Sequence, residues 1–305
     1  MVAVPRTRPP ALASLVERLW QRYERQFAAL RQGGLAEPAV HEFRVASRRL
    51  MNLLRGIRGR PRRAETEALR RALRRRFKTL ARLRDVQVER ALAAALARGN
   101  PAAAGFLRWL SREEDRLRKA LRAGLTQDAL HPERARCHAL LLRLRRAGRE
   151  TTQRLGLRRW LRQRARAVLR RQADLMRDDL DTLHRLRVAL KQFRYALEAA
   201  QALGRDGALA RPLARARRWQ SRLGALQDLR VLRTDCAAFA ERHPQRDSGA
   251  LLRAIDGALE RRRRAHWRVR GRLAALVRPF ARDAATPSLR RSAGDRPAQP
   301  PAPAA

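Results

Sequence analysis

Two segments of the chain share a pattern of cations, one histidine and apolar residues that is typical of an amphipathic helix. They read HEFRVASRRLMNLLR at 41–55 and HRLRVALKQFRYALE at 184–198. At about 100° per residue, each segment gathers its histidine and basic residues on one arc and its apolar side chains on the opposite arc. We therefore predict two equivalent helices, each with one face for a core and one cationic face.

The distance between these segments recurs elsewhere in the chain. His184 lies 143 residues after His41, and the same step leads from LARLRDVQV (80–88) to LGALQDLRV (223–231), so that Asp85 corresponds to Asp228. Two motifs at one offset indicate a duplicated helical unit. The predicted fold class is all-α, with two quasi-equivalent helical bundles related by a pseudo-two-fold axis. In such a fold the two cationic arcs are expected to line a shared cleft.

Glycine and proline mark the ends of the predicted helices. A first repeat is expected over about 11–130, a connecting helix over about 132–152 and a second repeat over about 155–280. Residues 1–10 are expected to be flexible, and 281–305, rich in Pro, Ala and Arg, to form a disordered tail. Besides the motif helices, which start at about 37 and 180, helices are predicted over 11–31, 63–82, 85–99, 102–124, 157–175, 208–222, 226–242 and 248–280.

The two aspartates of the repeat are expected to be structural. Asp85 and Asp228 are each predicted to begin a helix, where an N-cap is the simplest role, and a bidentate pair with an arginine of the motif helix is the other. Gly224 is expected to break the chain before the second of these helices. The last helix is expected to bend at Gly257 and Gly271.

The net charge identifies the class of partner. Lys and Arg number 72 against 28 Asp and Glu, which leaves a formal charge of +44. Self-repulsion of this size destabilises a compact state unless anions neutralise it. The expected partner is therefore a polyanion: nucleic acid, a phosphate polymer or an acidic membrane surface. Arginine, whose fork suits bidentate contact with phosphate, supplies nearly all of the positive charge.

The cationic arcs have two interpretations, a solvated helix surface or an anion site, and their agreement in register favours the second. His41 and His184 could donate to a phosphate oxygen, or could order a helix end through a carbonyl or carboxylate; neighbouring cations are expected to lower their pKa. Glu198 is expected to orient Arg194 or an arginine of a neighbouring helix. The basic run 70–78 and its counterpart are either a further wall of the site or solvated surface; the counterpart comprises Arg215, Arg217, Arg218 and Arg222.

Several classes of site are not expected. No His, Cys or Asp cluster has metal-ligand spacing, and no Gly-rich phosphate loop or nucleophile elbow occurs. We therefore expect no metal, no cofactor and no enzymatic activity. No window of about 18 uninterrupted apolar residues predicts membrane insertion. With two cysteines and no signal-peptide pattern, a cytoplasmic location is expected.

The four motifs together resemble the two halves of a CHAD domain, the conserved-histidine α-helical domain. The resemblance covers about 11–280 and is closest in the second half. It implies two bundles about a pseudo-two-fold axis and a basic channel that binds inorganic polyphosphate, with association with polyphosphate granules in bacteria. The binding residues that it implies are His41, Arg44, Arg48, Arg49, His184, Arg187, Lys191, Arg194 and Tyr195.

To these residues we add Arg55, Lys78, Arg218 and Arg222 from the cationic arc and the basic runs. Where the second copy has Arg194 and Tyr195, the first has methionine and asparagine, so the first copy is expected to make fewer contacts. The E-x-E-x-K signature of the triphosphate-hydrolysing domain that many family members carry is absent. We therefore expect a stand-alone, non-catalytic polyphosphate binder.

The alternative function is a sequence-independent nucleic-acid-binding protein that contacts phosphates alone. Single-strand binders usually add aromatic rings on which bases stack. Tyr195 is the only aromatic residue on the two polar arcs. This scarcity favours polyphosphate over nucleic acid.

Overall fold

The computed structural model describes residues 11–56, 63–97, 103–146, 157–177, 179–204 and 207–282. Within these ranges every regular element is a helix, which confirms the all-α class. The helices are α1 (Ala11–Gln32), α2 (Glu37–Gly56), α3 (Arg63–Thr79), α4 (Ala81–Leu96), α5 (Ala104–Arg122), η3 (Gln127–Leu130), α6 (His131–Arg146), α8 (Leu157–Ala173), α9 (Leu180–Gly204), η4 (Gly207–Leu209), α10 (Ala210–Arg242), α11 (Gly249–Val269) and α12 (Gly271–Ala281).

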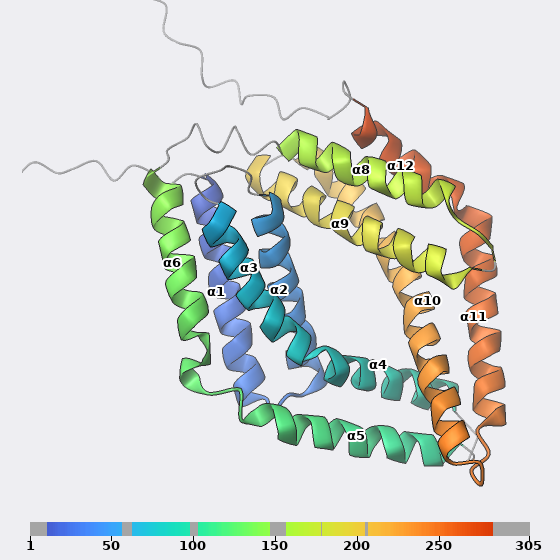
Figure 1. Ribbon diagram of the computed structural model, residues 1–305. Helices are drawn as coiled ribbons and strands as arrows, with labels where there is room; N and C mark the ends of the chain where they lie inside the picture. Colours follow the sequence, from blue (N-terminus) through green and yellow to red (C-terminus); the bar gives the residue numbers. More distant parts are fainter. Residues whose placement is uncertain are drawn as a thin grey trace, which may run out of the picture.

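The helices are arranged as the sides of a frame (Figure 1). One side is a bundle of α1, α2, α3 and α6, and another contains α8, α9 and α12. The pair α4–α5 and the pair α10–α11 form the remaining sides. The two halves of the chain meet at two places, where α2 packs against α9 and α4 packs against α10. These two contacts close the frame, and the motif helices α2 and α9 belong to two of its sides.

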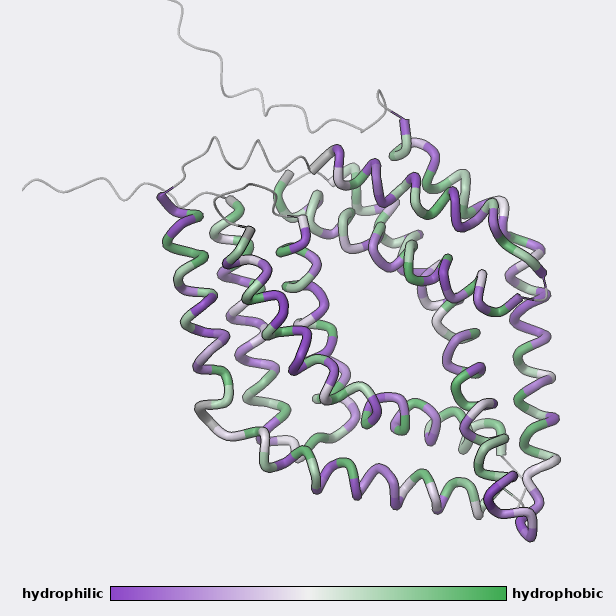
Figure 2. Tube along the Cα trace, viewed as in Figure 1, coloured by the Kyte–Doolittle hydropathy of each residue, from purple (hydrophilic) through white to green (hydrophobic). Residues whose placement is uncertain are grey.

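Each helix buries one stripe of apolar side chains in a core that runs through both halves. Figure 2 shows hydrophobic and hydrophilic residues alternating along the helices, as amphipathic helices require. In the first bundle, Phe43 of α2 contacts Tyr23 and Phe27 of α1, with ring centroids 5.0 and 5.8 Å apart. In the second, Phe193 of α9 meets Phe280 of α12 at 5.5 Å. Burial of each such ring stabilises the fold by about 1.5–3 kcal/mol.

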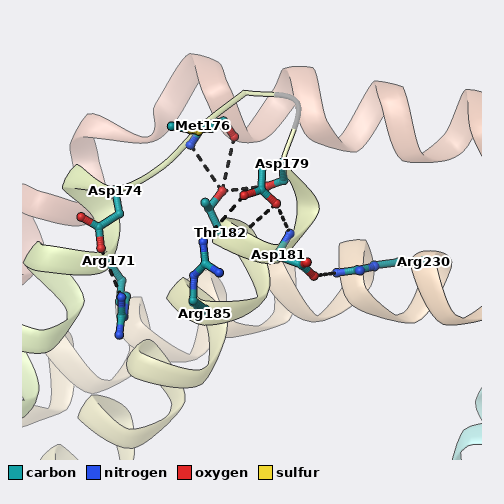
Figure 3. A network of polar contacts seen from close by, with 8 residues as sticks. All are labelled: Arg171, Asp174, Met176, Asp179, Asp181, Thr182, Arg185 and Arg230. Atoms are coloured by element: carbon teal, nitrogen blue, oxygen red, sulfur yellow. Dashed lines mark hydrogen bonds and ion pairs between the residues drawn. The ribbon is translucent and has the colours of Figure 1, made fainter.

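The second motif helix, α9, begins at an aspartate cap. The Oδ1 of Asp179 accepts hydrogen bonds from the backbone N–H groups of Asp181 (2.6 Å) and Thr182 (3.3 Å) (Figure 3). These N–H groups would otherwise lack partners at the start of the helix. The carboxylate of Asp181 accepts a hydrogen bond of 2.6 Å from Arg230 of α10. The cap and this bond together fix α9 against α10.

The first motif helix, α2, begins differently, after a tight reversal. Gly34 and Leu35 have φ values of 57° and 66°, the left-handed region that glycine adopts without strain. The carbonyl of the buried Leu35 accepts a hydrogen bond of 3.0 Å from Gln87 of α4. In the first turn of α2, Glu37 forms an ion pair with Arg84 of α4. Side chains of α4 therefore hold the start of α2.

The other end of α2 lies tightly against the second half of the chain. A Cβ added to Gly56 would lie 2.9 Å from the indole ring of Trp160 in α8, closer than real Cβ contacts. Trp160 itself is buried. Gly56 therefore allows α2 and α8 to approach at a place where a side chain does not fit.

The structure corrects several predicted boundaries. α10 runs from Ala210 to Arg242, so the predicted break at Gly224 is wrong. Leu223 and Leu226 are buried beside it, and this packing outweighs the cost of about 1 kcal/mol of a glycine within a helix. Gly257 lies inside α11 and does not bend it, whereas Gly271 does start a separate helix, α12.

Two further expectations concern the ends of the chain and the link between its halves. The predicted connecting helix corresponds to α6, which packs against α1 and α3 in the first bundle. Residues 147–152 of that prediction lie outside the described residues. The same is true of residues 1–10, predicted to be flexible, and of 283–305 in the predicted tail.

Candidate anion-binding site

Four basic side chains of the two motif helices lie close enough to influence one another's charge. They are Arg44 and Arg48 of α2 with Arg187 and Lys191 of α9, and we call them the central basic group. All four are half-buried. The packing of α2 against α9 brings these residues together from opposite halves of the chain.

The electrostatics of the central basic group are repulsive. Burial, followed by the charges of Arg187, Arg48 and Arg44, lowers the pKa of Lys191 to about 8. Burial also lowers the pKa of Arg44 and of Arg187, although guanidinium groups keep their charge at neutral pH. Two like charges 4 Å apart repel by about 1–4 kcal/mol in a wet or partly buried site. An anion bound here would relieve that repulsion.

The positive charge of the group has little internal compensation. Over the part of the chain that the structure describes, no carboxylate forms an ion pair with Arg48, Arg187 or Lys191. The Nε atom of Arg48 is buried and has no hydrogen-bond partner. A buried donor without a partner costs about 1–3 kcal/mol. Three of the four cations therefore have no ion-pair partner of their own, which leaves their charge available to an anion from outside.

Asp85 and Asp228 flank the group but do not cap helices, so the N-cap prediction is wrong. α4 begins at Ala81, four residues before Asp85, and Asp228 lies in the interior of α10. Asp85 interacts electrostatically with Arg44, and Asp228 with Arg187. Desolvation raises the pKa of both carboxyl groups, against the lowering effect of the neighbouring arginines.

The two histidines lie at the edge of the site in different surroundings. Burial and then the charge of Arg84 lower the pKa of His41, in the direction predicted. His184 is exposed, and its Nδ1 lies 2.7 Å from the Oε1 of Gln227. Arg84 and Gln227 were missed by the analysis of motifs, although the offset of 143 residues that relates the repeats also relates these two.

A second cluster holds three of the predicted binding residues. Arg194 is 8% exposed, donates to Gln220, forms an ion pair with Glu198 and lies 4.1 Å above the ring of Tyr195. Glu198 also lies 3.7 Å from the Nε of Arg49 and 3.2 Å from Arg217 of α10. Tyr195 lies near enough to Arg187 to affect its pKa. Both side chains are buried, and Arg194 already contacts Gln220, Glu198 and the ring of Tyr195.

The remaining predicted cations are exposed. Arg55 extends the central basic group, because its charge also lowers the pKa of Lys191. Arg222 lies 5.2 Å from the ring of Trp219 and lowers the pKa of the buried His266, so it faces α11. No contact in the described ranges ties Lys78 or Arg218 to the central basic group.

The described residues contain no group of three or more His, Cys, Asp or Glu side chains that could hold a metal ion. None of their helices has the length and apolar character needed to cross a membrane.

Comparison with known proteins identifies the architecture. A family model described as the CHAD domain matches residues 14–237. The crystal structure of the CHAD domain from the plant Ricinus communis superposes with a TM-score of 0.59 at 22% sequence identity, covering 88% of this chain and 90% of that chain. At this identity the likeness shows the fold alone. No curated protein matches the chain.

Proposed function

The chain belongs to the CHAD domain family, and from that premise we propose that it binds inorganic polyphosphate through the central basic group. The observation that carries this proposal is the meeting of cations from both halves of the chain, of which Arg48, Arg187 and Lys191 form no ion pair among the described residues. A polymer with one charge on every phosphate unit can contact the arcs of α2 and α9 at once. Arginine forks and a lysine suit its oxygens.

We also infer that the two halves are structural repeats about a pseudo-two-fold axis. Moving each α-helix of the first half by 143 residues leads, in order, to α8, α9, α10, α11 and α12, with α3 falling on η4 and the start of α10 and α4 falling within α10. The helices that join the halves, α2 with α9 and α4 with α10, are equivalent under this step. A two-fold axis brings equivalent elements together in this way, so one polymer would meet two similar binding surfaces.

The aromatic rings near the site favour polyphosphate over nucleic acid, because arginine side chains already cover them. Arg44 lies 4.1 Å from the centroid of the Phe77 ring, and Arg194 covers Tyr195 at the same distance. Neither ring is therefore free to stack on a base, which is the usual device of single-strand binders. In this proposal the domain binds polyphosphate without transforming it and associates with polyphosphate granules.

The proposal is tested by removing one cation from each half. In calorimetric titrations with long-chain polyphosphate, the Arg48→Ala/Lys191→Ala double variant should bind at least about tenfold more weakly than the wild type, with a shallower salt dependence. The control is Arg146→Ala/Arg253→Ala, which removes the same charge from exposed positions on α6 and α11. If both double variants lose the same affinity, net charge and not the central basic group carries binding.

A further inference from the structure

A pocket of about 320 Å³ lies where α1, α2, α9 and α10 meet. Its lining contains no member of the central basic group. Its apolar walls include four leucines, and α9 contributes Tyr195 and Ala199. The leucines are Leu15 and Leu19 of α1, Leu53 of α2 and Leu213 of α10. Polyphosphate has no apolar atoms and gains nothing from such walls, so the proposed function does not account for this pocket.

The polar end of the pocket has an excess of positive charge. Arg49, Arg217 and Glu198 line it, and the buried Arg194 pairs with Glu198 from behind. Three guanidinium groups thus share a single carboxylate, which leaves two positive charges uncompensated. Among the described residues, Arg49 makes only the ion pair of 3.7 Å with Glu198, a distance too long for a hydrogen bond, so its donors remain available.

Ligand pockets in proteins combine apolar walls with a few placed polar groups and have volumes of roughly 300–1,000 Å³. We propose that this pocket binds a small amphipathic anion, whose apolar body lies against the leucines and whose carboxylate or phosphate head contacts Arg49 and Arg217. This site is separate from the polyphosphate site and goes beyond the proposed function. Because Arg49 directly follows Arg48 in α2, the two sites share one helix.

The test is a calorimetric titration of the full chain with decanoate and, separately, with decyl phosphate, both below their micelle concentrations. We expect saturable binding of one molecule per chain by at least one of them, and the stronger binder identifies the head group. Decyltrimethylammonium, with the same tail and the opposite charge, and inorganic phosphate, which has no tail, should both bind far more weakly.

Three variants test whether the ligand binds in this pocket. Arg217→Gln, at a side chain 54% exposed, removes one head-group contact and leaves Glu198 paired with Arg194; affinity should fall about tenfold. Ala202→Phe, at an exposed rim position, should block the pocket while leaving polyphosphate binding intact. Arg211→Gln, the same charge change at an exposed position of α10 outside the lining, should change nothing. Absence of saturable binding, or affinity unaffected by Ala202→Phe, would overturn the proposal.

Discussion

The two motif helices carry equivalent cations but hold them in different ways. In α2, Arg44 donates a hydrogen bond of 3.0 Å to the carbonyl of Phe77 and lies over its ring. In α9, the equivalent Arg187 makes no hydrogen bond or ion pair among the described residues, and its strongest charge interaction is with Asp228. At the next equivalent position, α2 has Arg48, whose charge is permanent, whereas α9 has Lys191, with its pKa lowered to about 8.

The cationic face of α2 is therefore more rigidly held than the cationic face of α9. The first half holds its arginine through contacts that exist without a ligand. In the second half, the position of Arg187 and the charge of Lys191 depend more on whether an anion is bound. The same comparison extends to the ends of the two helices, since Gly56 of α2 corresponds to Ala199 of α9. The following predictions test each part of the comparison.

The largest expected effect is on stability, at the glycine of α2. Gly56→Ala should lower the free energy of unfolding by about 1–3 kcal/mol, because the new methyl group would lie against the buried ring of Trp160. The matched change Ala199→Gly, at the equivalent position of α9, should cost about 1 kcal/mol through helix propensity and lost packing. Urea unfolding monitored by circular dichroism measures both. A Gly56→Ala variant as stable as the wild type would mean that the contact of α2 with α8 has room for a methyl group.

The second prediction separates Arg44 from Arg187. Arg44→Ala should lower the free energy of unfolding by about 1–2 kcal/mol, because it removes a charged hydrogen bond and a cation–π contact. Arg187→Ala should lower the unfolding free energy of the ligand-free protein by less than about 1 kcal/mol, because Arg187 loses the attraction of Asp228 but makes no hydrogen bond or ion pair among the described residues. Both variants should bind polyphosphate more weakly. If unfolding shows the reverse order of stability, the second half is the anchored one.

The third prediction concerns pH and is the smallest effect. An anion favours the charged form of Lys191, so polyphosphate affinity should decline by up to about tenfold as pH rises from 7 through 9. Without ligand, stability should rise over the same range, because an unfolded lysine still holds its proton up to a pH of about 10.4. Lys191→Arg should bind with little dependence on pH. A decline of the same size in that variant would place the titrating group elsewhere.

Much of the fold follows from patterns that are local in sequence. Apolar periodicity predicts where α1, α2, α5 and α9 lie, because each buries a single stripe of its own residues. The errors arise where packing against elements distant in the sequence determines the helix boundaries. The sequence around Gly224 predicts a helix break, because the packing of the residues on both sides of it is not visible in the sequence. Asp85 is predicted as an N-cap because the true helix start at Ala81 has no capping side chain to mark it.

The candidate site shows the same limit. Helical periodicity places Arg194 and Lys191 on one polar arc and Glu198 within reach of Arg194. Only the position of α10 decides that Arg194 is also buried against Gln220. The meeting of Arg48 with Lys191 depends on the packing of α2 against α9, a contact between halves that no periodicity contains. The offset of 143 residues was the sequence signal that pointed to it.

The central claim is that the cations shared by α2 and α9 select polyphosphate. It is tested most directly by calorimetric titration of the wild-type protein with long-chain polyphosphate, duplex DNA and single-stranded RNA at matched phosphate concentration and about 150 mM salt. The account predicts strong binding of polyphosphate under conditions in which both nucleic acids bind weakly. Equal affinity for all three polymers would contradict it, since the net charge of +44 would then act as a general attraction for polyanions.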